Sequence, residues 1–159
     1  MPKSTASKVS IPSTTISLYE SDLNLWLENE IAHLMAGDLH NLDIENLIEE
    51  LEGLAGRDRR ELKNRLRVLL EHLLKRLYVD MPQEFNGWER TIREQRSQIK
   101  IIFEQSPSLK SFWENCFESA WGYALYEVQE NYSQCEFPRL WQFSRDIDTM
   151  LNAKLWIVS

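Results

Sequence analysis

The longest regular pattern of apolar residues in the chain lies between residues 62 and 77. Leucines recur there at spacings of three and four, which places them on one face of an α-helix. They are Leu62, Leu66, Leu69, Leu73 and Leu77, with Leu70 and Leu74 widening the face. Each buried leucine contributes roughly 1.5–3 kcal/mol of transfer free energy. This helix is therefore predicted to form the centre of the core.

A second apolar stripe comes just before the leucines, flanked by carboxylates. It consists of Ile44, Leu47, Ile48, Leu51 and Leu54. We expect its helix to pack against the leucine helix through matching apolar faces. Gly53 and Gly56 lie at the join and weaken helical structure there, so the pattern predicts either a kink or a tight corner.

Caps and breaks divide the remaining chain. Ser17 and Glu20 have the spacing of a capping box, Gly37 is suited to end a helix, and Ser106 with Pro107 marks a restart with serine as the cap. We expect helices at about residues 17–36, 43–54, 57–80, 87–105, 107–133 and 145–152. The helix at 107–133 is apolar around most of its circumference, so it is predicted to be central to the bundle or covered by a second subunit.

Composition favours one all-α domain. The chain has 159 residues, only five glycines and five prolines, and little strand-like alternation. Its length suits one core. We predict a single helical bundle of about five or six helices over residues 17–159. Residues 1–16 are predicted to be a disordered tail, or alternatively a basic arm in which Lys3 and Lys8 contact a partner.

The net charge of −7 argues against broad nucleic-acid binding, although a local basic patch remains open. The chain has neither the apolar run of a membrane span nor that of a secretory signal, so we expect a cytoplasmic protein without membrane contact. Two cysteines do not make a disulfide framework or suggest a zinc site.

Arg65 and His72 are the candidate catalytic residues. They are seven residues apart and share one helix face. Their loose spacing resembles that of the higher-eukaryotes-and-prokaryotes nucleotide-binding class of metal-independent ribonucleases, often toxin–antitoxin proteins. There a histidine could move a ribose proton while an arginine steadies the phosphate. The structural alternative pairs both residues with Glu45, Glu49 or Glu52 of the neighbouring helix.

A metal site is the weaker alternative. Glu30 and His33 have the spacing of half a di-iron site, but no second copy of this motif exists. Glu45, Glu49 and His72 could still meet as a mononuclear site. With three histidines in the chain, we predict no metal ligands and no cofactor.

Gln95 and Arg96 interrupt the apolar stripe of the helix at 87–105. A buried guanidinium needs a partner, which we expect to be Glu49 or Glu50. Alternatively, Arg96 lines a cleft that binds an acidic partner or phosphate. Trp88 is a further binding candidate together with Glu45 and Glu49, although the six tryptophans fit a core and interface role at their helical spacing.

Several motifs together resemble a known family. They include Tyr19-Glu20, Trp26-Leu27, the run from Leu42 to Glu52, Arg60-Glu61-Leu62, Arg65 to Leu70, His72 to Lys75, Ile92 to Arg96 and Ser106 to Leu109. The combination, over about Leu18 to Phe143, is similar to the domain-of-unknown-function family twenty-nine (DUF29), small helical proteins abundant in cyanobacteria. The resemblance implies an all-α bundle and brings no established activity, substrate or catalytic residue.

The sequence therefore predicts a non-enzymatic protein-interaction or homodimerisation domain that buries the aromatic surface of the helix at 107–133 in a homodimer or partner protein. A metal-independent ribonuclease using Arg65 and His72 is the alternative, so the sequence does not decide whether the protein is an enzyme. A metal-binding bundle is the third and weaker hypothesis.

Overall fold

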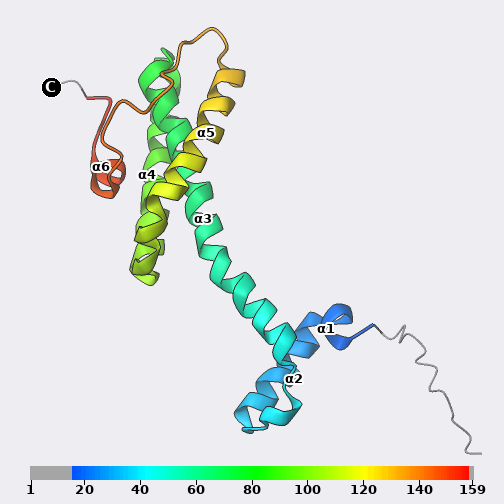
Figure 1. Cartoon of the computed structure of the whole chain (residues 1–159). Coiled ribbons are helices and arrows are strands. Elements are labelled where there is room, and N and C mark those ends of the chain that lie inside the picture. The colour runs from blue at the N-terminus through cyan, green and yellow to red at the C-terminus, as the bar shows by residue number, and fades with distance from the viewer. Residues whose placement is uncertain (1–15, 158–159) are drawn as a thin grey trace, which may run out of the picture. The chain divides into compact units, whose positions relative to one another are not determined.

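The computed structural model describes residues 16–157. Within that range it contains six α-helices, two short 3-10 helices and no strand, which confirms the all-α prediction (Figure 1). The elements are α1 (Leu18–Ser21), α2 (Leu23–Met35), η1 (Leu39–Asn41), α3 (Ile44–Tyr78), α4 (Pro82–Gln105), η2 (Pro107–Phe112), α5 (Trp113–Asn131) and α6 (Ile147–Asn152). Apart from Ile16, the predicted tail lies outside the described residues.

The chain divides into two compact units between Glu52 and Gly53. We call their described parts the N-terminal unit (residues 16–52) and the C-terminal unit (residues 53–157). The single domain expected over residues 17–159 stays a prediction. None of the helices within residues 16–157 has the length and apolar character needed to cross a membrane.

In the N-terminal unit, the helix expected at 17–36 is two helices. The Ser17 hydroxyl accepts a hydrogen bond from the Glu20 amide at 3.3 Å and so caps α1 as predicted. Asp22 leaves the helical conformation and its carboxylate accepts from the Leu25 amide at 3.0 Å, which starts α2. The prediction missed this break because a second cap directly after the first looks like part of one helix.

Gly37 ends α2 as predicted, with a φ of 68°. The Gly37 amide donates to the Leu34 carbonyl at 3.1 Å and the Asp38 amide donates to the His33 carbonyl at 2.9 Å. These two bonds are the Schellman arrangement, which satisfies carbonyls that the helix end would otherwise leave free. The chain then turns through η1 into α3.

The long helix α3 is continuous from Ile44 to Tyr78. Gly53 and Gly56 are both helical, so of the two predicted alternatives the tight corner is wrong. The expected packing of the Ile44–Leu54 stripe against the Leu62–Leu77 stripe is therefore wrong, because both stripes follow one another on the same helix. Each glycine destabilises the helix by about 1 kcal/mol. The residues with high helix propensity on both sides offset this cost.

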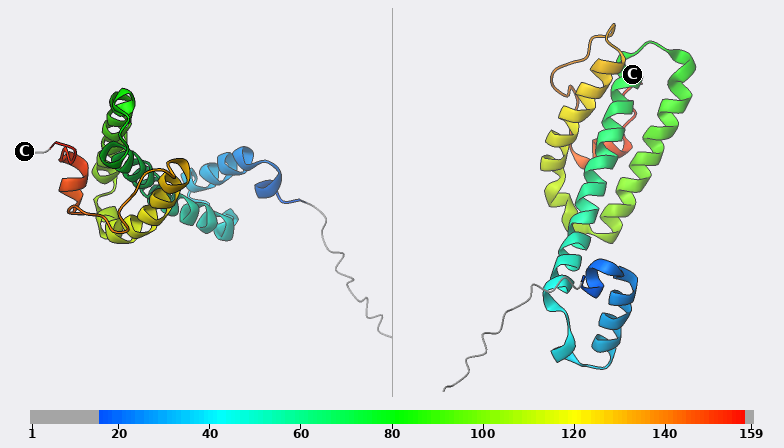
Figure 2. Two further views of the ribbon diagram at one scale, coloured as in Figure 1. Left: turned by 90° about the horizontal axis from the view of Figure 1, so that it is seen from above. Right: turned by 90° about the vertical axis from the view of Figure 1, so that its right-hand side faces the viewer.

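In the C-terminal unit, α3, α4 and α5 lie side by side and alternate in direction, and α6 packs against α4 (Figures 1 and 2). Six α3 leucines are buried, and Leu62, Leu66 and Leu69 are completely inaccessible. They pack with residues of the other helices, which include Ile92, Ile99, Trp113, Phe117, Ala120, Ala124, Val128 and Met150. This core confirms the leucine face as its centre.

The prolines set boundaries that differ from those predicted. Pro82 occupies the first turn of α4, where its missing N–H needs no partner, so α4 begins about one turn earlier than expected. After Pro107 the chain forms the 3-10 helix η2, and α5 begins only at Trp113. Ser106 is not the side-chain cap that we expected, since its hydroxyl instead donates to the Asp58 carboxylate at 3.4 Å.

Most of the apolar circumference of α5 lies in the core of its own chain. Seven of its residues are buried, among them Trp113, Phe117 and Trp121. Tyr123 and Tyr126 remain 60% and 63% exposed. Two explanations were predicted for this apolar helix, a central position in the bundle or cover by a second subunit. The central position accounts for most of its apolar side chains.

Candidate functional site

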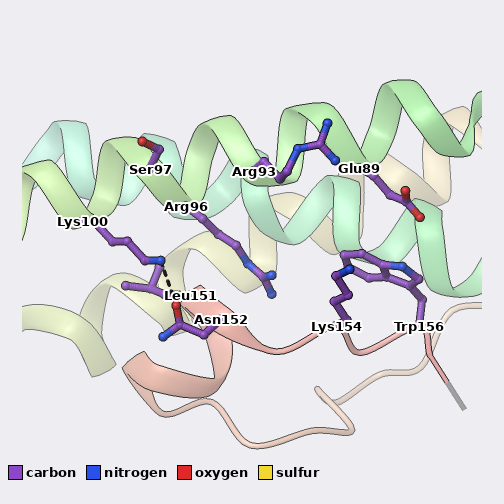
Figure 3. Close-up of a pocket in the computed structure, with 9 residues that line it drawn as sticks. All are labelled: Glu89, Arg93, Arg96, Ser97, Lys100, Leu151, Asn152, Lys154 and Trp156. Carbon is purple, nitrogen blue, oxygen red and sulfur yellow. Dashed lines mark hydrogen bonds between the residues drawn. The ribbon is translucent and has the colours of Figure 1, made fainter. Parts of the chain in front are cut away.

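A pocket of about 400 Å³ opens between α4 and the end of α6 in the C-terminal unit (Figure 3). The α4 side chains reach it at a helical spacing of three to four residues, whereas the α6 end contributes the other wall. It is lined by Glu89, Arg93, Arg96, Ser97, Lys100, Leu151, Asn152, Lys154 and Trp156. Its volume lies in the range of small-molecule sites.

Arg96 is the buried charged group of this pocket, with 7% of its surface exposed. Its Nε donates to the Met150 carbonyl at 2.8 Å and its Nη2 donates to the Ala153 carbonyl at 2.7 Å. Desolvation lowers the pKa of Arg96. The expected partner, Glu49 or Glu50, is wrong: the guanidinium instead binds carbonyls at the C-terminal end of α6, where the helix dipole favours a cation.

The other charged groups give the pocket a cationic character. Lys100 extends toward α6, and its Nζ donates to the Asn152 amide oxygen at 2.8 Å (Figure 3). Arg93 and Lys154 are exposed at its margin. The one lining carboxylate, Glu89, accepts a hydrogen bond from Arg76 Nε at 2.9 Å, so its charge is already matched.

Arg65 and His72 have separate partners. Arg65 Nη1 donates to the side-chain oxygen of buried Gln95 at 3.3 Å, and its Nε lies 3.7 Å from Glu61. His72 Nδ1 lies 2.8 Å from the Val68 carbonyl, which can only accept, so the proton sits on Nδ1. Nε2 then accepts from Lys75 Nζ at 3.3 Å. The structural alternative expected Glu45, Glu49 or Glu52 as partners, and the structure shows other partners instead. The catalytic pairing of Arg65 with His72 stays a prediction.

Burial lowers the pKa of His72, and the nearby Lys75 charge lowers it further, against the opposing effect of the Val68 carbonyl. Burial also lowers the pKa of Lys75. The half-buried imidazole is therefore held neutral at physiological pH. A neutral histidine could act as a base, but its unprotonated nitrogen, Nε2, already accepts the hydrogen bond from the Lys75 ammonium.

The remaining candidates are dispersed. Glu45 and Glu49 are exposed on the first turns of α3. Trp88 is buried and packs edge-on against Tyr132, with ring centroids 6.3 Å apart. Within residues 16–157, no three His, Cys, Asp or Glu side chains are grouped so that they could hold a metal ion. Glu30 and His33 also have different partners, Asp43 and Asp38.

The N-terminal unit is organised by a polar network that was not predicted from the sequence. Trp26 Nε1 donates to the Asp43 carboxylate at 3.0 Å, and the Asn46 side chain donates to the same oxygen at 2.7 Å. The buried Glu30 carboxylate accepts from the Asp43 amide at 2.9 Å. Together these bonds join α2 to the start of α3. They lower the pKa of Asp43, with Asn46 as the largest cause and Trp26 next.

Tyr19 extends this network. Its hydroxyl donates to Glu50 at 2.6 Å, and this bond is the main reason why the pKa of Tyr19 rises to about 12. The Tyr19 ring stands edge-on to Trp26 with centroids 4.7 Å apart. The hydrogen-bonded pairs Tyr19–Glu50, Trp26–Asp43 and Glu30–Asp43 are 13 to 31 residues apart in sequence, so no local spacing signals them.

The α4 pocket, in contrast, has a sequence signal. Arg93, Arg96 and Lys100 are three to four residues apart, which places three cations on one side of the helix.

The surface of the N-terminal unit is unusually apolar. Only Trp26 and Glu30 are buried there. Eleven of the seventeen large apolar side chains that are exposed in the described chain belong to it: Ile16, Leu23, Leu25, Leu27, Ile31, Leu34, Met35, Leu39, Ile44, Ile48 and Leu51. Clusters of this kind on a surface mark interaction sites.

Comparison with known proteins places the chain in a family. The family described as Domain of unknown function DUF29 matches residues 18–156, nearly the whole chain. No curated protein and no solved structure matches the chain. The match agrees with the resemblance found from the sequence motifs and extends it into α6. The chain belongs to the DUF29 family.

Proposed function

We propose that the protein is a non-enzymatic interaction domain that forms a homodimer through its N-terminal unit. The observation that carries this proposal is the set of eleven exposed leucine, isoleucine and methionine side chains in residues 16–52. A unit that buries one tryptophan and one glutamate gains little from its own core. Burial of the exposed side chains against a second surface supplies that missing stabilisation.

The polar network supports a docking role because it fixes the shape of the unit before any partner binds. The Trp26–Asp43 and Glu30–Asp43 bonds hold α2 against the start of α3 without using the outward-facing apolar side chains. Those side chains therefore stay available. A preorganised surface loses less conformational entropy on binding.

Charge indicates what the occupant of this surface must be. Residues 16–52 contain ten Asp and Glu residues and no Lys or Arg. Direct contact between two such units would bring like charges together, which is unfavourable. The docking surface on the other side should carry cations around apolar or aromatic groups.

The C-terminal unit offers such a surface, which we call the basic–aromatic face: Arg59, Arg60, Lys63, Phe112, Tyr123 and Tyr126. The Arg59 guanidinium lies 3.7 Å from the Phe112 ring centroid, and Lys63 Nζ lies 5.2 Å from that of Tyr123. Two shallow pockets of about 240 and 470 Å³ adjoin on this face at Ser119. Glu118 lines the larger pocket and shares Arg145 with Glu114, so one negative charge remains there against the three cations of the face.

We therefore propose that the N-terminal unit of one copy docks on the basic–aromatic face of a second copy. In this dimer the exposed α5 side chains Tyr123 and Tyr126 lie in the interface, while the other aromatic residues of α5 are buried in the core of their own chain. We place the dimer in the cytoplasm, in keeping with the free thiols of Cys116 and Cys135.

A charge-swap experiment tests the proposal. Sedimentation velocity should show a dimer for the full chain and monomers for E45K/E49K and for R59E/R60E, because each variant repels its own kind. An equimolar mixture of the two variants should regain the dimer, since both of its contacts are again between opposite charges. E94K/E136K changes two exposed glutamates outside both surfaces and should dimerise normally.

A wild-type monomer at about 100 µM would contradict the proposal, because a stable interface of standard size should hold at that concentration. A dimer that survives both reversals would also contradict it. A mixture that stays monomeric would show that these two surfaces do not meet.

A further inference from the structure

We propose that the pocket between α4 and the end of α6 binds a small phosphorylated organic compound. The pocket lies in the C-terminal unit alone and does not depend on the homodimer. Arg96 lines it and is more than nine-tenths buried.

No carboxylate balances Arg96 within residues 16–157: the ion pairs there involve other groups. Both hydrogen bonds of Arg96 go to neutral carbonyls, those of Met150 and Ala153. Carbonyl dipoles orient a guanidinium but leave its net charge in place. A buried cation without a counter-ion is costly, and an anion in the adjoining pocket would offset that cost.

Three more cations line the same pocket, Arg93, Lys100 and Lys154. Lys100 also has a neutral partner, Asn152, whose amide is held in place because its Nδ2 donates to Asp148 at 2.9 Å. Glu89 is neutralised by Arg76. The pocket is thus strongly cationic in a chain whose net charge is −7, so its charge does not reflect a generally basic surface.

The number of cations favours a group with more than one negative charge. Arginine forks and a lysine match the several oxygens of a phosphate monoester better than the single charge of a carboxylate. The volume of about 400 Å³ also leaves room beyond the phosphate. Trp156, half-buried at the Glu89 side of the pocket, offers a flat apolar surface there (Figure 3).

Taken together, these positions suggest how the ligand would lie. Its phosphate would sit near Arg96 and Lys100, with Arg93 and Lys154 closing around it. Its organic part, planar or apolar, would rest on the Trp156 indole. Such a ligand would also strengthen the attachment of α6 to α4, because its charge would stabilise the Arg96 guanidinium that holds the end of α6.

Phenyl phosphate is a suitable probe because it combines both features, with inorganic phosphate and benzoate as partial probes. Calorimetric titration of the full chain should show one saturable site for phenyl phosphate and weaker binding of the other two. R93Q and K154Q remove exposed cations and should each weaken binding by about tenfold. R90Q is the matched control, an exposed α4 arginine that does not line the pocket, and should bind like wild type.

The variant W156A separates the two parts of the ligand. It should weaken phenyl phosphate and leave inorganic phosphate unchanged. Absence of saturable binding at millimolar phenyl phosphate would overturn the proposal, as would equal losses in R90Q and R93Q. Benzoate binding as tightly as phenyl phosphate would overturn the assignment of a phosphate, and inorganic phosphate binding as tightly would overturn that of an organic ester.

Discussion

The two halves of α3 carry similar apolar stripes in opposite environments. In the N-terminal unit, Ile44, Ile48 and Leu51 are 57%, 49% and 62% exposed. In the C-terminal unit, Leu62, Leu66 and Leu69 are completely buried under α4 and α5. A stripe at helical spacing therefore predicts that a surface is to be covered, but it does not say whether the same chain covers it.

The two units also differ in what holds them together. The C-terminal unit relies on a continuous apolar core, whereas the N-terminal unit relies on hydrogen bonds around Trp26 and Asp43. Apolar burial is non-directional and tolerant of small shifts. A network of charged and polar groups holds one geometry but contributes less free energy. The first arrangement suits a scaffold, and the second suits a surface that must be presented to a partner.

The largest contrast should appear when one apolar residue is truncated in each half of α3. Leu69→Ala should lower the free energy of unfolding by about 2–5 kcal/mol, because it opens a cavity in a filled core. Ile48→Ala, at low protein concentration, should change it by less than about 0.5 kcal/mol. Urea melts of both variants measure the difference, and equal losses would show that the two stripes are not in different environments.

Trp26→Phe tests the polar network. The change keeps an aromatic ring but removes the Nε1 donor to Asp43, and a hydrogen bond to a charged group contributes about 1.5–3 kcal/mol. Amide hydrogen exchange should become faster in residues 23–50 while the urea midpoint of the C-terminal unit stays the same. Unchanged exchange in that range would mean that the network does not hold the N-terminal unit.

Arg96→Met tests a buried charged group of the C-terminal unit. The loss of two bonds from a charged donor to α6 carbonyls should lower the free energy of unfolding by about 1–3 kcal/mol, since the apolar replacement offsets part of the loss. Hydrogen exchange should rise first in α6. If α6 exchanged as slowly as in wild type, its attachment would not depend on Arg96.

The smallest expected effect is a pH dependence from His72. Its pKa in the folded protein lies below the ordinary value of 6.5, so the unfolded chain takes up the proton first as the pH falls. The stabilisation is therefore complete above pH 6.5 and declines below it. Urea melts at about pH 7.5 and about pH 5.5 should show this loss. His72→Gln should reduce it, and an equal loss in that variant would assign it to other groups.

The sequence predicted the features that depend on local chemistry. The left-handed Gly37, the Ser17 cap and the buried leucine face all follow from a few neighbouring residues, and all are present. The sequence did not decide between a kink and a corner at Gly53 and Gly56, because helix propensity is a weak preference that neighbouring residues can override.

The candidate site was only partly predictable. Burial of Arg96 followed from its position on an apolar stripe, but its partners are backbone carbonyls more than fifty residues away, which no side-chain pattern reveals. The exposure of the first α3 stripe was hidden for a related reason: its spacing is the same whether its cover is another helix or another molecule. The Trp26–Asp43 bond joins residues across a turn and has no local signature.

We propose that two copies associate through the N-terminal unit. Hydrogen exchange of the full chain at about 1 µM and about 100 µM tests it most directly, because dimer formation depends on concentration. We predict that protection of residues 23–51 and of Tyr123 and Tyr126 increases at the higher concentration, while that of the leucines at 62–74 stays constant. Exchange in residues 23–51 that is the same at both concentrations, in a sample that sediments as a dimer, would contradict the account.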